Sequence, residues 1–536
     1  MMKRIHAFFE KNEFVIFCII AILNGLYVFA FKFYHTLDGP GHLHNSNMLI
    51  NILSGNELIS EYYRINSIPV GNWTGNAILS FYNYLFPAPI ALSFFIFTYF
   101  AGMAFSYRYL IKSLTGKFSP VNYIMFPFFD NACLNLGLYN YSISLIVLFI
   151  ILGFWIKHNQ KMNFYLWVRF SFLLILLYFS HFLSYVFFGI FLILYLIYDE
   201  FFKYKIPEKV DWKNIWIKIG RLGLASLPSI IFALIYVINI ISIVNSGSRN
   251  EQEQMTLLQN FYYIRPLILF HVENDGTRNI ILFAGLMGLF ILVIFQRIFR
   301  RYLLEENKYN RGFVLVLLIF FTILLLLLPA RFLLNTMRIR VALMFFMIFV
   351  IWLGMYRYTV WLQVLAVIFF IGITVHNKTA YYKARSKMDK YASEINALNN
   401  WIKPNSIVLP LKHSSMWMYA YSLSYIGIDK PIVNLKNEQA FGFFNIVYND
   451  NLPPYTMGKK SVQHSRLTQG AEAEKDRTKI VDYVVIANPN KLNNEYEVDS
   501  VLNSNLSAYY SQIIISSSNN FVLFKRNLQT DNQNDQ

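Results

Sequence analysis

The residues of this chain best suited to chemistry lie in the stretch 37–44, which reads Leu-Asp-Gly-Pro-Gly-His-Leu-His. Asp38 supplies a carboxylate, and His42 and His44 supply two imidazoles, directly after an apolar run at 14–33. A carboxylate at the edge of a membrane is costly unless it is paired, hydrated or used, so Asp38 indicates a functional site. Such an acid can take a proton from a hydroxyl group or hold a metal ion.

Two other interpretations of this stretch stay open. Asp38 is also a suitable N-cap for a short helix with Pro40 in its first turn, although capping leaves His42 and His44 unexplained. A metal site built from Asp38, His42 and His44 requires an irregular backbone, because residues i and i+2 do not share a helix face. The cofactor is therefore unknown, and a divalent metal such as Mg or Mn, held by Asp38 and His42, is the candidate.

Further polar side chains follow the apolar runs on the same predicted side of the membrane. An acid together with distant arginines suits a reaction with an anionic leaving group, because guanidinium forks neutralise phosphate. The simpler alternatives are a tight turn at 137–141, a packing role for the histidine and anchoring of the arginines among lipid headgroups. The candidate substrate-binding or donor-binding residues are His44, Tyr139, Asn140, His181, Arg331, Arg338 and Arg340.

The composition is that of a polytopic membrane protein. Of 536 residues, 56% are hydrophobic and only 14% are charged, whereas a soluble chain carries about 25% charged residues. The net charge of +17 comes mainly from short loops between apolar runs, which is the positive-inside pattern. No nucleic-acid-binding motif is present, so nucleic acid is not an expected partner.

Apolar runs of about 20 residues, the length needed to cross a bilayer, predict about eleven transmembrane helices. Basic residues in the inner loops place the N-terminus inside and the C-terminus outside. Asp130 is the best mid-span ionisable residue, and Glu273 and Asp275 are predicted to be solvated loop charges. The predicted spans are at about 14–34, 89–111, 119–135, 141–157, 164–180, 182–198, 222–245, 280–296, 312–329, 341–356 and 359–375.

Three parts follow from this pattern. Residues 1–376 form the transmembrane domain, with a first outer loop at about 38–87 in which near-helical spacing from Leu43 to Leu53 suggests a helix lying in the interface. Residues 377–526 form a small extracytoplasmic α/β domain, and residues 527–536 form a disordered tail. The predicted elements of the α/β domain are a helix at 380–401, strands at 406–410, 481–486, 512–515 and 521–524, and a helix near 498–509.

This architecture resembles the GT-C class of integral membrane glycosyltransferases, particularly uncharacterised bacterial members. In that class an acidic motif follows the first helix, and residues 38–42, Asp-Gly-Pro-Gly-His, stand in that place here. Phe126-Pro127-Phe128, the stretch 137–141 (Gly-Leu-Tyr-Asn-Tyr) and the stretch 180–184 (Ser-His-Phe-Leu-Ser) are also similar to stretches in those relatives. Many members carry two neighbouring acids, whereas Asp38 stands alone until Glu57, which favours a base over a metal ligand.

The resemblance implies transfer of a sugar from a polyprenyl-phosphate-linked donor to an extracytoplasmic glycan, lipid or protein, at a bacterial cytoplasmic membrane. Asp38 would be the general base or metal-binding carboxylate, and Arg338 or Arg340 would bind the donor phosphate. Two alternatives remain: a transporter or flippase for a lipid-linked or polyanionic solute, and a non-catalytic membrane assembly subunit. The transporter would need ionisable residues in mid-span, and the assembly subunit would tolerate replacement of Asp38.

Overall fold

The fold is described from a computed structural model of the chain. The residues it describes are 11–203, 212–244, 257–299, 308–328, 336–412, 417–440, 442, 444–449, 481–488 and 506–527. They belong to two compact units. The helical unit comprises Met1–Ala30, Ile68–Gly75 and Ile96–Lys383, and the sheet unit comprises Phe31–Ser67, Asn76–Phe95 and Ala384–Gln536. The predicted outer loop at 38–87 is therefore shared between the units, and the division at residues 376 and 377 stays a prediction.

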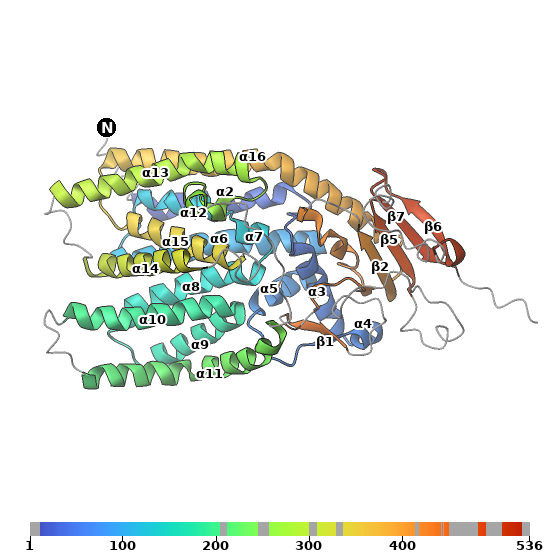
Figure 1. The fold of residues 1–536 in the computed structure, drawn as a ribbon, viewed down its shortest axis with the longest axis horizontal. Helices are drawn as coiled ribbons and strands as arrows, with labels where there is room; N and C mark the ends of the chain where they lie inside the picture. The colour runs from blue at the N-terminus through green and yellow to red at the C-terminus, as the bar shows by residue number, and fades with distance from the viewer. Residues whose placement is uncertain are drawn as a thin grey trace, which may run out of the picture. The chain divides into compact units, whose positions relative to one another are not determined.

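The helical unit is a bundle of long apolar helices, and the chain is a multi-pass membrane protein. Nine described helices are long and apolar enough to cross a membrane, and α9 is a shorter apolar helix. The predicted topology, N-terminus inside and C-terminus outside, stays a prediction. The helices are α2 (Glu13–Leu26) with η1 (Tyr27–Ala30), α6 (Ala88–Thr115), α8 (Tyr139–His158), α9 (Phe164–Ser180), α10 (Phe182–Lys203), α11 (Trp212–Val244), α12 (Leu257–Tyr262), η4 (Arg265–Leu267), α13 (Val272–Phe299), α14 (Lys308–Leu327), α15 (Thr336–Gly354) and α16 (Val360–Leu398) (Figure 1).

The predicted third span, 119–135, is wrong as a single helix. The structure has a short 3-10 helix, η2 (Pro120–Phe128), and one turn of α-helix, α7 (Ala132–Asn135). Pro127 removes a backbone donor within this segment, and the Asn131 side chain accepts a hydrogen bond from the Leu134 N–H to start α7 afresh. Residues 121–128 are all buried, so the protein rather than lipid surrounds the broken backbone, as a membrane interior requires.

The broken segment nevertheless runs along the bundle, antiparallel to α15. Asn122 packs against Gly354 at the end of α15, and the Phe128 ring lies 6.1 Å from that of Phe346, further toward its start. The Asn135 side chain then donates to the Leu269 carbonyl at 2.8 Å. The segment therefore lies alongside α15, with a different local structure from the single helix that was predicted; that it crosses the membrane stays a prediction.

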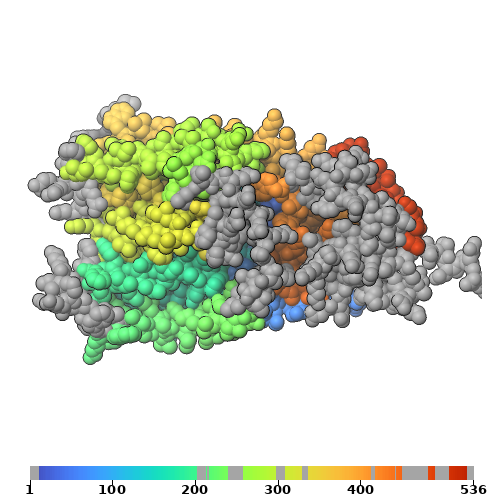
Figure 2. All heavy atoms as spheres, in the orientation of Figure 1, coloured from blue at the N-terminus to red at the C-terminus, as the bar shows by residue number. Residues whose placement is uncertain are grey.

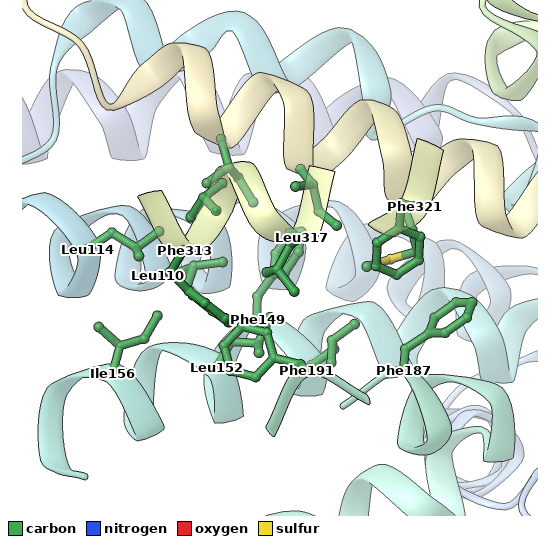
Figure 3. Close-up of a pocket in the computed structure, with 15 residues that line it drawn as sticks. Leu110, Leu114, Phe149, Leu152, Ile156, Phe187, Phe191, Phe313, Leu317 and Phe321 are labelled. Atoms are coloured by element: carbon green, nitrogen blue, oxygen red, sulfur yellow. The ribbon is translucent and has the colours of Figure 1, made fainter. Parts of the chain in front are cut away.

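The interior of the bundle is apolar. Helices α8 and α15 are mostly buried, and α14 packs on α15 while α9 packs on α8, α10 and α11. In the space-filling view α14, in yellow, shows between α13 in light green and α10 in teal (Figure 2). A cavity among α6, α8, α10, α14 and α15 is lined only by apolar residues, including Phe187, Phe191 and Phe321 (Figure 3), so it has no acid, base or charged group that could do chemistry.

The sheet unit contains a mixed five-stranded sheet in the order β3-β2-β5-β7-β6. Strands β2 (Ser406–Lys412), β3 (Ile432–Asn434) and β5 (Tyr483–Ala487) are parallel, and β7 (Phe521–Arg526) and β6 (Tyr510–Ile515) continue the sheet antiparallel. The four predicted strands are thereby confirmed, whereas β3 was missed because it has only three residues. The predicted helix at 380–401 is the second half of α16. Residues 498–505 and 528–536 lie outside the described residues.

The predicted interfacial helix exists as α3 (Gly39–Leu53), but its predicted location is wrong. Its residues from Gly39 to Leu49 are all buried, because it packs inside the sheet unit rather than on a lipid surface. Three further elements complete this part of the chain: α4 (Glu57–Tyr62), α5 (Thr74–Leu85), and the antiparallel pair of β1 (Tyr63–Ile65) with β4 (Ile446–Tyr448).

Asp275, predicted to be a solvated charge, is in fact buried, with 1% of its surface exposed. Its carboxylate forms an ion pair with Arg278 and accepts the backbone N–H groups of Leu269, Phe270 and His271 at 2.8–3.2 Å. It thus satisfies the donors that precede α13, and its charge is compensated inside the protein.

Candidate functional site

Asp38 lies at the N-cap position of α3, in the sheet unit. Its backbone enters the helix there and Pro40 follows in the first turn, but its side chain makes no capping hydrogen bond. The carboxylate is half-buried. The N-cap position is therefore confirmed, while the capping bond that would give the side chain a purely structural role is not formed.

His42 lies one turn after Asp38 on the same helix, and its backbone N–H donates to the Asp38 carbonyl at 3.2 Å. Its ring is held by a chain of carboxamides. His42 Nδ1 lies 2.7 Å from Asn76 Oδ1, and Asn76 Nδ2 donates to Asn445 Oδ1 at 2.7 Å. Because an amide oxygen only accepts hydrogen bonds, His42 donates through Nδ1, which leaves the lone pair of the neutral ring on Nε2.

His44 points to a different environment from that of Asp38 and His42. It is fully buried, and its Nδ1 donates to the Ile426 carbonyl at 2.9 Å. Burial lowers the pKa of His44 to about 4, against the opposing effect of the bond to Ile426. The ring is packed within the sheet unit, and its buried Nε2 has no hydrogen-bond partner among the described residues. Its predicted role in donor binding stays a prediction.

The residues around Asp38 do not suit a divalent metal. In the described part of the chain no group of three or more His, Cys, Asp or Glu side chains comes together. His42 already uses Nδ1 for Asn76, and His44 faces Ile426, so one carboxylate and one imidazole remain. A catalytic metal takes about three protein ligands; we therefore derive no step through a metal.

Described residues from the C-terminal half of the chain, among them Asn437, Gln439 and Asn445, surround the first turn of α3 within the same unit. Gln439 Nε2 donates to the Asp38 carbonyl at 2.9 Å, and Asn45 Nδ2 donates to the Gln439 carbonyl at 2.9 Å. A Cβ atom on Gly41 would lie 2.7 Å from Gln439 Cδ, so only glycine allows this close approach. Asn76, Gln439 and Asn445 were missed by sequence reasoning, because isolated amides in loops carry no recognisable pattern.

A second cluster, in the helical unit, forms around Tyr141. The Arg340 guanidinium lies over the Tyr141 ring at 5.3 Å, and Tyr141 Oη donates to the Arg340 carbonyl at 3.2 Å. The His181 ring makes a T-shaped contact with the Tyr141 ring, with centroids 5.2 Å apart. The structure thus brings together two predicted residues, Arg340 and His181, through a tyrosine that the sequence placed only in a turn.

The electrostatics of this cluster favour an anion. Arg340 is half-buried, its buried Nε has no hydrogen-bond partner among the described residues, and none of the carboxylates they include pairs with it. Burial, and then the Arg340 charge, hold the pKa of His181 well below its usual value. His181 Nδ1 accepts from the Leu183 N–H at 3.2 Å, so the neutral ring carries its proton on Nε2 and can donate there.

The other predicted binding residues take structural or undescribed positions. Tyr139 is fully buried at the start of α8. Asn140 Oδ1 accepts from the Gly75 N–H at 2.8 Å and so holds the first turn of α5 against the start of α8. The turn before them is confirmed, since Gly137 has a φ of 75°. Arg338 is buried, two residues before Arg340 on α15, and Arg331 lies outside the described residues.

The broken third crossing carries a polar cavity of its own. Asp130 lines it together with Pro127, Asn377, Lys378 and Tyr381, all within the helical unit. Lys378 donates to the Asn24 carbonyl and lies 4.7 Å and 4.9 Å from the Phe100 and Tyr27 rings. The charged residues Asp130 and Lys378 thus line one cavity beside the interrupted segment.

Comparisons with known proteins leave the family of the chain open. No protein-family model matches the chain. No curated protein matches it either. Among solved structures, it is similar to the crystal structure of ArnT from Cupriavidus metallidurans bound to undecaprenyl phosphate, with 10% sequence identity, a TM-score of 0.36, and coverage of 95% of this chain and 97% of that chain.

Proposed function

We propose that this protein is an integral membrane glycosyltransferase that moves a sugar from a polyprenyl-phosphate-linked donor to a hydroxyl acceptor outside the cytoplasm. The observation that carries the proposal is Arg340, a half-buried guanidinium stacked on Tyr141 without a carboxylate partner among the described residues. A partly desolvated positive charge costs free energy until an anion pairs with it. A planar guanidinium fork is well matched to phosphate oxygens.

In the proposed reaction the acceptor hydroxyl loses its proton to the Asp38 carboxylate. The acceptor oxygen forms a bond to the anomeric carbon of the donor sugar, and the bond from that carbon to the phosphate oxygen breaks. The leaving polyprenyl phosphate takes the electron pair of that bond. The role proposed for the Arg340 cluster of the helical unit, considered by itself, is to bind the phosphate of the lipid-linked donor, with the neutral His181 as a hydrogen-bond donor.

Asp38 is proposed as the general base because it is the acid that follows the first apolar run, one turn before His42, and its surroundings among the described residues do not suit a metal. His42, one turn further on, is proposed to act beside it on the acceptor, with its neutral tautomer set by Asn76. General-base catalysis by a positioned carboxylate typically contributes a factor of about 10² to 10⁴ to the rate. This is the size of effect expected when Asp38 is replaced.

The proposed partners and location follow from the same reading. The donor is a lipid, so the protein works in a membrane, and we propose the bacterial cytoplasmic membrane. The sheet unit would then lie on the extracytoplasmic side, where the acceptor is available. The acceptor itself is a glycan, a lipid or a protein with a free hydroxyl group.

The test is Asp38→Asn in the native cell, with extracytoplasmic glycans followed by mass spectrometry and the protein level followed by immunoblot. We expect one sugar to be lost from a glycan while the protein accumulates normally. Glu57→Gln is the matched control, because it removes the next acid along the chain, which is exposed in the first turn of α4. Unchanged glycans in the Asp38→Asn strain would refute the proposed chemistry.

A transporter of a lipid-linked or polyanionic solute is the second candidate, and the Asp130 cavity is the observation that favours it. Interrupted helices with mid-span charges form the substrate and ion sites of many transporters. A transporter requires Asp130→Asn to abolish function while Asp38→Asn leaves it intact. A glycosyltransferase requires Asp38→Asn to abolish product formation whether or not Asp130 is changed.

A further inference from the structure

Two buried carboxamides beside the first turn of α3, Gln439 and Asn445, each have a polar atom without a hydrogen-bond partner among the described residues. Gln439 is 6% exposed and Asn445 is 1% exposed. Each uses one end of its amide: Gln439 Nε2 donates to the Asp38 carbonyl, and Asn445 Oδ1 accepts from Asn76. The other end of each, Gln439 Oε1 and Asn445 Nδ2, is buried and has no hydrogen-bond partner among the described residues.

These two atoms are of opposite kinds. Gln439 Oε1 is an acceptor and Asn445 Nδ2 is a donor. Leaving a buried polar atom unsatisfied costs about 1–3 kcal/mol, and the large majority of buried polar side-chain atoms in proteins have a partner. Two such atoms beside one helix turn indicate that a polar ligand completes them.

The local structure holds these amides in place. Asn437 Nδ2 donates to Asn45 Oδ1 at 2.7 Å, and Asn437 Oδ1 accepts from the Gln439 N–H at 3.2 Å. The Asn66 N–H donates to the Asn445 carbonyl at 2.9 Å. The residues are therefore held in place beside the α3 turn that carries Asp38 and His42, which is a requirement for a specific polar site.

We propose that Gln439 and Asn445 are specificity-determining residues that bind hydroxyl groups of a sugar at the Asp38 turn. A sugar hydroxyl both donates and accepts, so neighbouring hydroxyls satisfy an amide oxygen and an amide N–H together. The ligand has no charge to neutralise, and the amides supply none. The assignment rests on the proposed function, since it places the sugar ring of donor or acceptor beside the proposed base.

The first arm of the experiment measures binding without chemistry. Full-length protein in lipid nanodiscs is mixed with single free monosaccharides at millimolar concentration: glucose, galactose, mannose, N-acetylglucosamine and arabinose. Binding is followed by saturation-transfer NMR, and the melting temperature of each variant confirms folding. We expect at least one sugar to bind the wild-type protein.

The variants target the two unpartnered atoms. Asn445→Asp replaces Nδ2 by an oxygen while the other oxygen still accepts from Asn76, and Gln439→Met removes both polar atoms at nearly constant size. Each is expected to weaken sugar binding about tenfold, the effect of one lost hydrogen bond of about 1.4 kcal/mol. Asn51→Ala is the matched control, because that carboxamide lies on the same helix and already bonds to Asn47.

The outcomes separate this inference from the proposed function. Equal binding in wild type, Asn445→Asp and Gln439→Met overturns the inference, and so does the absence of binding of every sugar to the wild-type protein. Asp38→Asn is expected to retain sugar binding while losing transfer. If it keeps transfer and the amide variants lose sugar binding, the proposed chemistry falls while the sugar site stands.

Discussion

Replacing Arg340 by methionine should lower anion binding while leaving the stability of the protein unchanged or slightly raised. Methionine keeps most of the length of the side chain but removes the charge. The stacking of the guanidinium on Tyr141 at 5.3 Å is worth about 0.5–1 kcal/mol, and this is lost. Relief of a half-buried charge without a carboxylate partner among the described residues returns about 1–2 kcal/mol, a fraction of the several kcal/mol of full burial.

The loss of binding is expected to be large. A guanidinium fork on phosphate makes two charge-assisted hydrogen bonds of about 1.5–3 kcal/mol each. Allowing for the contacts that remain, Arg340→Met should cost about 3–4 kcal/mol, or about 100- to 1000-fold in Kd. Arg340→Lys keeps the charge but not the fork, so a loss of about tenfold is expected.

The assay is thermal unfolding of nanodisc-embedded protein with farnesyl phosphate as the probe. At a probe concentration of 100 times the wild-type Kd, binding stabilises the wild type by about 2.7 kcal/mol. A hundredfold weaker Kd leaves about 0.4 kcal/mol of this stabilisation. The control is Arg311→Met, which removes another buried arginine stacked on a tyrosine, Tyr356, at 5.2 Å.

Two results would refute the reasoning. One is full stabilisation of Arg340→Met by the probe, which would mean that the guanidinium does not bind the phosphate. The other is a loss of stability without the probe as large as that of Arg311→Met, which would mean that Arg340 serves packing alone.

Two further predictions concern packing and pH. Gly75→Ala should destabilise the protein by about 1–3 kcal/mol, because its Cβ would lie 2.8 Å from Asn140 Oδ1; Gly189→Ala, with no atom within 4 Å, should be neutral or slightly stabilising in thermal unfolding. The pKa of His44 falls from 6.5 to about 4 on folding, so the unfolded chain binds its proton first as the pH drops. The free energy of unfolding should therefore fall by about 3 kcal/mol between pH 6.5 and pH 4. His44→Gln should flatten the dependence of the melting temperature on pH in this range. A pH dependence unchanged by His44→Gln would show that His44 is not the titrating group.

Hydropathy predicted the long apolar helices well. Most of the predicted spans coincide with described helices, because a helix needs about 20 consecutive apolar residues to cross the hydrocarbon core of a bilayer. The third crossing departs from this rule. Its apolar content is high, but Pro127 and Asn131 divide it, and neighbouring helices cover the exposed backbone. Hydropathy does not report that protection, so the broken helix could not be predicted.

The candidate site was predictable in its charged members and not in its neutral ones. Asp38 and Arg340 could be identified from the sequence because a charged side chain near a membrane costs free energy unless it is paired, hydrated or functional. The separation of His42 from His44 also followed from helix geometry, and the structure confirms it. Gln439 and Asn445 lie about 400 positions further along the chain and could not be identified from the sequence. The role of a neutral amide depends on its hydrogen-bond partners, which are known only from the tertiary structure.

The sequence by itself determined that this chain builds a membrane-embedded helical bundle with an acid after its first helix and arginines near a later one. Those conclusions depend on local properties, hydropathy and charge, which each residue carries wherever it lies. Only the tertiary structure decided that Arg340 stacks on Tyr141 beside His181, that His44 is buried against Ile426, and that Gln439 contacts the Asp38 turn. Contacts between residues hundreds of positions apart depend on the path of the whole chain, which no local pattern encodes.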